Sequence, residues 1–167
     1  MRSRGVTFYL EPKFLYNFKG ASASTPDENY IIPFGKAKVR REGKDVSIIS
    51  YGSAIHLSLQ AAEELEKEGI SVEVVDLRSL VPWDKDTVFQ SVRKTSRVIV
   101  AHEDKLTGGF GGEIVSEITE NCFKYLDAPI LRVGSKGTPV GFAKNYEVEI
   151  LLTKNDIMEK VKEVSKF

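Results

Sequence analysis

The run His102-Glu103-Asp104 contains the residue types best suited to chemistry, and it directly follows an apolar, strand-like stretch. A histidine beside a carboxylate can act as an acid–base pair. Neighbouring residues on a strand point to opposite faces, however, so His102 and Glu103 cannot easily share one proton. A zinc site is not favoured, because His56 is the only other histidine and the spacing of a zinc-protease helix is missing. The sequence therefore predicts no catalytic residue and no metal ligand.

A glycine-rich run at residues 106–112 is the second candidate, and it contains Gly108, Gly109, Phe110 and Gly111. Backbone N–H groups at the start of a helix attract anions, so such a run can hold a phosphate. It lacks the Lys-Ser/Thr of a P-loop and does not follow the first strand, as a dinucleotide-binding motif should. Close packing of the backbone explains the glycines at least as well.

Ser53 is a possible nucleophile by residue type, but Tyr-Gly-Ser-Ala-Ile is not the Gly-x-Ser-x-Gly of a nucleophile elbow. The residues around it predict a strand at 46–50, a turn, and a helix at 54–69, because apolar residues recur there every three or four positions. Ser53 is placed to cap this helix with its side chain. A strand at 71–77 then completes a right-handed βαβ unit.

The rest of the chain repeats this alternation. A short charged edge strand is expected at 37–42, and further buried strands at 97–101 and 128–133. Further helices begin after Asp84, after the glycine run, and at Thr153. Their expected buried residues are Val88, Val92, Ile114, Ile118, Cys122, Ile157, Val161 and Val164, with Val115 and Phe123 beside them. The fold class is α/β, a three-layer α/β/α sandwich.

Ligands of such sheets bind beyond the carboxyl ends of the strands, where the strand order reverses. If the crossovers leave strand 46–50 in opposite directions, that point lies between residues 51–53 and 102–104. We therefore expect a crevice formed by Gly52, Ser53, His102, Glu103 and Asp104.

Composition limits the class of protein. The 167 residues carry 24 basic and 24 acidic side chains, which gives no overall electrostatic case for binding nucleic acid or an anionic membrane. Cys122 is the only cysteine, so an internal disulfide is impossible, and a reducing, intracellular location is expected. No apolar run approaches the ~18 residues of a membrane span. Residues 1–4 are not followed by the apolar core of a secretory leader.

The N-terminal part does not fit this sandwich. Residues 6–10 have the composition of a strand, yet no helix follows to bury them. Residues 17–29 are small, polar and turn-prone, which is typical of a linker. We place a domain boundary there.

Six blocks, in order and at compatible spacing, carry a resemblance to a known family: residues 8–16, 30–37, 75–80, 91–95, 108–114 and 126–133. Through them nearly the whole chain resembles the end of the β subunit of thiamine-diphosphate-dependent 2-oxo acid dehydrogenases, and within it the transketolase-type C-terminal domain.

The resemblance implies a mixed five-stranded sheet in which the edge strand 37–42 runs antiparallel beside 72–77, followed by 46–50, 98–101 and 130–133. Residues 1–36 would be the remnant of an upstream pyrimidine-binding domain plus a linker, and residues 37–167 the C-terminal domain. The full enzyme of this family uses thiamine diphosphate and Mg²⁺. This chain, which shows no Mg²⁺–diphosphate motif, is expected to bind neither and to be inactive alone.

The resemblance also implies partners: the α subunit, a second β subunit and the peripheral-subunit-binding domain of the acyltransferase, the last through Phe167 and its carboxylate. The glycine loop would serve packing or an interface. Residues 81–84 and 102–110 look most like branched-chain enzymes, whereas 135–142 departs from the family pattern. A eukaryotic source would imply the mitochondrial matrix, and any other source the cytoplasm. The alternative is a free-standing flavodoxin-like module that binds a small anion in the crevice.

Overall fold

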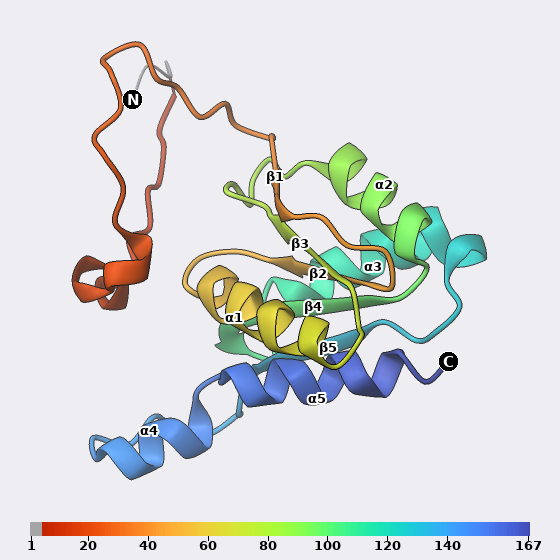
Figure 1. The fold of residues 1–167 in the computed structure, drawn as a ribbon. Helices are drawn as coiled ribbons and strands as arrows, with labels where there is room; N and C mark the ends of the chain where they lie inside the picture. Colours follow the sequence, from red (N-terminus) through yellow and green to blue (C-terminus); the bar gives the residue numbers. More distant parts are fainter. Residues whose placement is uncertain (1–4) are drawn as a thin grey trace.

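A five-stranded sheet forms the middle layer of the protein, whose residues 5–167 are described by a computed structural model (Figure 1). Its strands are β1 (Lys38–Arg41), β2 (Val46–Ser50), β3 (Val72–Asp76), β4 (Val98–Lys105) and β5 (Leu131–Ser135). Their order is β1-β3-β2-β4-β5, with β1 antiparallel to β3 and the other neighbours parallel. The predicted fold class, strand order and antiparallel edge are confirmed.

Two helices cover each face of the sheet. The helices α1 (Ala54–Lys67) and α5 (Lys154–Val164) contribute to one hydrophobic core, and α2 (Lys85–Thr95) and α3 (Gly111–Cys122) to the other. The predicted helix stripes are confirmed, because each of these side chains is fully buried: Val88, Val92, Ile114, Ile118, Cys122, Ile157, Val161 and Val164. All five residues of β2 are buried, as expected for a central parallel strand covered on both faces.

The predicted caps have different outcomes. Asp84 caps α2 by accepting a hydrogen bond from the Thr87 N–H at 3.1 Å, and Thr153 caps α5 in a capping box with Asp156. The predicted Ser53 cap of α1 is wrong, because the Ser53 side chain makes no capping hydrogen bond. Ser53 has helical φ and ψ of −72° and −23°, whereas a residue that caps with its side chain is usually extended.

The strand predicted at residues 6–10 is also wrong. Residues 6–12 have no regular secondary structure, and Val6, Phe8 and Leu10 are 91%, 87% and 82% exposed. The reason is that a strand needs a hydrogen-bonding neighbour, and the sheet offers these residues none. Two short 3-10 helices, η1 (Lys13–Asn17) and η2 (Lys19–Ala21), follow in a segment that runs outside the sandwich (Figure 1). Residues 1–4, where no leader was expected, lie outside the described residues.

Three further boundaries differ from the sequence prediction. β4 extends through Lys105 and so includes the run 102–104, while β5 begins at Leu131 rather than at residue 128. Phe123 is 73% exposed, because α3 ends at Cys122 and a 3-10 turn, η3 (Phe123–Tyr125), rotates its ring outward. A short helix, α4 (Lys144–Ile150), was not predicted, and it projects from the sandwich (Figure 1).

The loop after β3 fastens the start of the sheet to residues 35–37. Arg78 donates to the carbonyl groups of Lys36 and Ala37, at 3.0 and 3.1 Å, and Asp84 accepts the Ala37 N–H at 3.0 Å. Ser79 accepts the Gly35 N–H at 2.9 Å. Arg78 has a positive φ of 57°, which turns its side chain back toward this segment. These contacts fix the direction from which the chain enters β1.

In the part of the chain that the structure describes, none of the helices combines the length and the apolar character needed to cross a membrane.

Candidate functional site

The predicted crevice residues all come from the segments where β2 and β4 end, although neither of the two pockets described below is lined by them. Ser50 pairs with Ala101 in parallel register, so the chain segments after these residues leave the same edge of the sheet side by side. β2 lies between β3 and β4, so the crossovers leave it in opposite directions. The strand order therefore reverses where the sequence predicted it.

Glu103 extends over the first turn of α1. Its Oε2 accepts the Ser53 N–H at 3.4 Å and lies 3.4 Å from where a Cβ on Gly52 would be. Gly52 has a φ of 62°, which lets the backbone turn sharply beneath this carboxylate. The start of α1, the natural position for a bound anion, therefore carries a carboxylate of the protein itself.

His102 points to the opposite face of β4. Its side chain is fully buried against three glycines, Gly109, Gly111 and Gly134, where an added Cβ would overlap or crowd the imidazole. The glycines at 109 and 111 therefore serve close packing, while Gly108 has a φ of 76° and open space beside it. His102 and Glu103 lie on different faces and share no hydrogen bond in the described structure.

Tyr51 and Asp104 contact each other beside His102. The Tyr51 hydroxyl donates to Asp104 Oδ2 at 2.6 Å, and its ring lies parallel to the His102 ring with centroids 6.2 Å apart. Phe110 meets Tyr51 edge to face, with centroids 6.3 Å apart. Burial and the bond to the Asp104 carboxylate raise the pKa of the Tyr51 hydroxyl far above its ordinary value. Tyr51 therefore stays protonated and acts here as a donor.

A second group of titratable residues lies at the end of β3, and the sequence analysis did not identify it. Burial raises the pKa of Asp76, against the opposing effects of the Arg78 N–H and of Arg40, whose Nη1 is 3.4 Å from Asp76 Oδ2. Burial also lowers the pKa of His56, whose ring meets Phe18 edge to face at 5.2 Å. Arg40 lies on β1 and Asp76 on β3, and these two strands pair antiparallel. Their proximity can therefore be seen only when the strand pairing is known, and not from the sequence.

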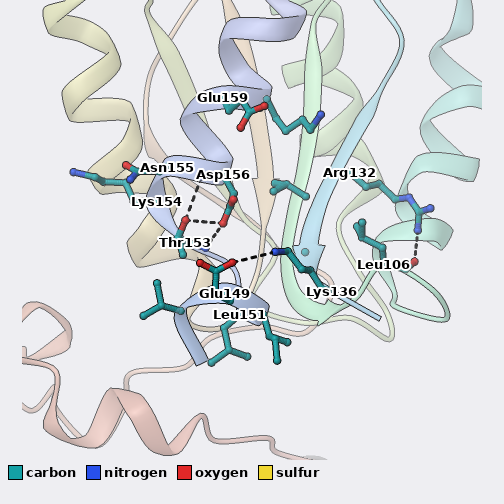
Figure 2. Close-up of a pocket in the computed structure, with 15 residues that line it drawn as sticks. Leu106, Arg132, Lys136, Glu149, Leu151, Thr153, Lys154, Asn155, Asp156 and Glu159 are labelled. Atoms are coloured by element: carbon teal, nitrogen blue, oxygen red, sulfur yellow. Dashed lines mark hydrogen bonds and ion pairs between the residues drawn. The ribbon is translucent and has the colours of Figure 1, made fainter. Parts of the chain in front are cut away.

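A pocket of about 610 Å³ lies elsewhere, between β5, the end of α4 and the start of α5 (Figure 2). Its polar side chains are engaged with one another: Lys136 Nζ lies 3.7 Å from Glu149 Oε2, and Asp156 accepts the Thr153 hydroxyl at 2.6 Å. No buried, unpartnered polar atom of the described residues lines it.

A smaller, mainly apolar groove of about 390 Å³ adjoins the C-terminus and includes Phe167 in its wall. The other residues in its wall are Val115, Thr119, Phe123, Leu126, Asp127, Ala128, Pro129 and Ile130. Phe123 and Phe167 are 73% and 65% exposed, so two aromatic rings border it. The Phe167 N–H donates to the Val164 carbonyl at 3.4 Å, within a turn that follows the end of α5.

The residues at these strand ends do not fit thiamine diphosphate. A diphosphate needs cationic or N–H donors, but Glu103 occupies the start of α1 and the Asp104 carboxylate accepts the Tyr51 hydroxyl on the other face of β4. Among residues 5–167 there is also no cluster of three or more histidine, cysteine or carboxylate side chains that could hold a metal. The same carboxylates disfavour the small anion of the free-standing-module hypothesis.

Several known proteins are similar to this chain over nearly its whole length. It is 41% identical over 162 residues to "2-oxoisovalerate dehydrogenase subunit beta 2, mitochondrial" of Arabidopsis thaliana, a match that covers 97% of this chain and 44% of that protein. It is 44% identical over 167 residues to "Pyruvate dehydrogenase E1 component subunit beta" of Staphylococcus aureus, covering 100% of this chain and 50% of that protein. The chain thus spans about half the length of these relatives.

The fold has a solved counterpart in a protein titled "Split gene transketolase, inactive beta4 tetramer". Its TM-score to this chain is 0.72 at 30% identity, and the match covers 84% of this chain and 44% of that one. The family model "Transketolase, C-terminal domain" matches residues 35–157, which include all five strands and the crevice. This match, together with the strand order and its reversal beside β2, shows that the chain belongs to the transketolase C-terminal domain family.

Proposed function

We propose that this chain is the C-terminal domain of the β subunit in the dehydrogenase component of a 2-oxo acid dehydrogenase complex. The observation that carries the proposal is the 41–44% identity, over 97–100% of the chain, to β subunits of two such enzymes. The domain serves subunit assembly and supplies no catalytic group. Thiamine diphosphate and Mg²⁺ belong to the assembled enzyme, whose compartment is mitochondrial if the source is eukaryotic.

A branched-chain 2-oxo acid is the favoured substrate of the assembled enzyme. Support comes from residues 81–84 and 102–110 and from the similarity to a 2-oxoisovalerate dehydrogenase subunit. The check is kcat/KM for 2-oxoisovalerate and for pyruvate, measured on the natural enzyme that contains this chain. A higher value for pyruvate would contradict the preference.

The exposed apolar side chains of the N-terminal segment support the proposed domain division. Val6, Phe8, Leu10 and Phe14 are all more than half exposed, in a chain that spans about half of its relatives. Burial of such residues stabilises a fold by about 1.5–3 kcal/mol each, so we propose that they pack on an upstream pyrimidine-binding domain. Residues 1–36 are then its remnant and linker, and residues 37–167 form the C-terminal domain.

A chimera tests the proposed function. The N-terminal half of the S. aureus β subunit is joined ahead of this chain and mixed with the S. aureus α subunit, thiamine diphosphate and Mg²⁺. We expect pyruvate-dependent reduction of an artificial electron acceptor at a rate at least about tenfold above that of the N-terminal half alone. This difference corresponds to about 1.4 kcal/mol of activation free energy. Light scattering should give a mass with two α and two β chains.

The matched control is this chain alone with the α subunit and the same cofactors, which should show no turnover. Calorimetry of the isolated chain with thiamine diphosphate and Mg²⁺ should show no heat beyond dilution. A chimera that folds and binds the α subunit but gives only background turnover would contradict the proposed function.

The C-terminal groove supports the proposed contact with the peripheral-subunit-binding domain of the acyltransferase. The exposed rings of Phe123 and Phe167 border it, and in the proposal the carboxylate of Phe167 completes the contact. A basic docking domain can bury a ring and pair with the carboxylate, and a charge-assisted contact of this kind contributes about 1.5–3 kcal/mol.

Deletion of Phe167 should weaken binding of that domain by about tenfold or more, which corresponds to 1.4 kcal/mol, and leave the thermal midpoint unchanged. Two matched variants separate the causes: Phe167→Ala removes the ring alone, and one added C-terminal glycine displaces the carboxylate alone. Calorimetric titration with the isolated docking domain gives the Kd. Equal affinity of the deleted and intact chains would place the docking surface elsewhere.

A further inference from the structure

The imidazole of His102 is buried without a hydrogen-bond partner. Among the described residues, five buried side-chain polar atoms lack a partner, and two of them are Nδ1 and Nε2 of His102. The side chain has no exposed area. The proposed function makes no use of this ring, yet a buried polar group without a partner costs free energy and calls for an explanation.

Three glycines, Gly109, Gly111 and Gly134, surround the ring, and we call them the glycine cradle. A Cβ on Gly109 or on Gly134 would lie 2.9 Å from His102 Cε1, and a Cβ on Gly111 would overlap the Cδ2–Nε2 edge. The backbone therefore approaches the imidazole from three places: the loop between β4 and α3, the start of α3, and β5.

Few charged or titratable groups face the ring. Tyr51 lies over it from the end of β2, Asp104 lies on its own strand, and Arg132 approaches from β5, while α3 presents only the backbone of Gly111. Tyr51 already donates to Asp104. The Asp104 backbone also faces the ring and favours its protonated form, although neither ring nitrogen makes a hydrogen bond within residues 5–167.

These surroundings disfavour a protonated ring. Burial lowers the pKa of His102, Arg132 lowers it further, and the carboxylate and backbone of Asp104 oppose the shift only in part. A second proton on the imidazole therefore has to be accommodated by movement of the backbone around it.

The same neighbours hold the strap, which we define as residues 105–112. Arg132 Nη1 donates to the Leu106 carbonyl at 2.7 Å (Figure 2), and the Leu106 N–H donates to the Ser135 carbonyl at 3.3 Å. A charge on His102 would repel Arg132, while the Asp104 carboxylate and backbone would attract it. The ring and the strap are thus coupled through the Arg132 side chain and three glycines.

We propose that His102 is a proton-responsive latch for the strap. The neutral imidazole fits the glycine cradle and keeps the strap closed over the carboxyl end of β4. When the ring takes up a proton from solvent, the strap opens and lets water reach the charge. The latch depends on this chain's own contacts and not on the proposed function.

The direction of the pH effect follows from linkage. The open strap leaves the ring with its ordinary affinity for protons, so the open form binds more protons than the closed form as the pH falls below about 6.5. The closed form is therefore fully stable at neutral pH and loses stability as the ring is protonated. Opening should be confined to the strap and the first turn of α3.

Hydrogen exchange of the full chain tests the latch. His56→Gln leaves His102 as the sole imidazole, and amide protection factors, corrected for intrinsic exchange, are compared at about pH 7.5 and about pH 5.5. Protection in residues 105–113 should fall by about threefold or more, while protection in α5 should stay unchanged. The His102→Asn variant in the same background should lose this pH dependence.

If the His102→Asn variant does not fold, an NMR titration of the single imidazole in the His56→Gln chain decides, and it should give a pKa below 6.5. A pKa at or above 6.5, unchanged protection of the strap, or an equal loss of protection in α5 would each overturn the latch. Persistence of the full pH dependence in folded His102→Asn would also overturn it.

Discussion

Gly111→Ala should lower the free energy of unfolding by about 1–3 kcal/mol, the usual cost of forcing extra carbon into a packed site. The new Cβ would overlap the imidazole of His102. That ring cannot move aside easily, because Gly109 and Gly134 hold its other edges. The loss is notable because alanine in a helix is ordinarily more stable than glycine by about 0.5–1 kcal/mol. Urea unfolding measures the difference.

Gly112→Ala is the matched control, one residue further along the same helix. A Cβ there meets only Arg132 Nη1, at 3.6 Å, which is ordinary van der Waals contact. The control should therefore be neutral or stabilising by up to about 1 kcal/mol. Equal stability of the two variants would mean that the glycine cradle around His102 is not tightly packed.

The buried stripes were predictable because apolar periodicity constrains them directly, whereas the strand order was expected only from the family resemblance. Val88 with Val92, and Ile114 with Ile118, have the spacing of one helix face, and the structure buries all four. The place where the strand order reverses was predicted on the condition that the crossovers leave β2 in opposite directions, and the order shows that they do. The helix stripes depend on patterns that are local in the sequence.

The features that the sequence could not predict depend on contacts between distant residues. Ser53 has the right type for a cap, but the start of α1 receives the carboxylate of Glu103, 50 residues further along the chain. Residues 6–10 have strand composition and no strand to pair with. His102 looked like a candidate for chemistry, and its burial among three glycines becomes visible only when β4, β5 and α3 meet.

Asp84 contacts both α2 and the segment that enters the sheet. Its Oδ1 accepts the Thr87 N–H at 3.1 Å, and its Oδ2 accepts the Thr87 hydroxyl at 2.8 Å and the Ala37 N–H at 3.0 Å. The residue is only 4% exposed. Burial alone would raise the pKa of Asp84, but the N–H groups of Ala37 and Thr87 outweigh it and hold the pKa below its ordinary value.

Asp84→Ala should therefore lower the free energy of unfolding by about 2–4 kcal/mol, because it removes a helix cap (about 0.5–2 kcal/mol) and leaves the Ala37 N–H unpaired (about 1–3 kcal/mol). Thr153→Ala is the matched control: it removes the α5 cap without a strand contact and should cost only about 0.5–2 kcal/mol. Urea unfolding gives both values, and hydrogen exchange at residues 35–37 should accelerate in Asp84→Ala alone. If the two variants lose the same stability and residues 35–37 stay equally protected, Asp84 acts as a cap and does not fasten the chain entering β1.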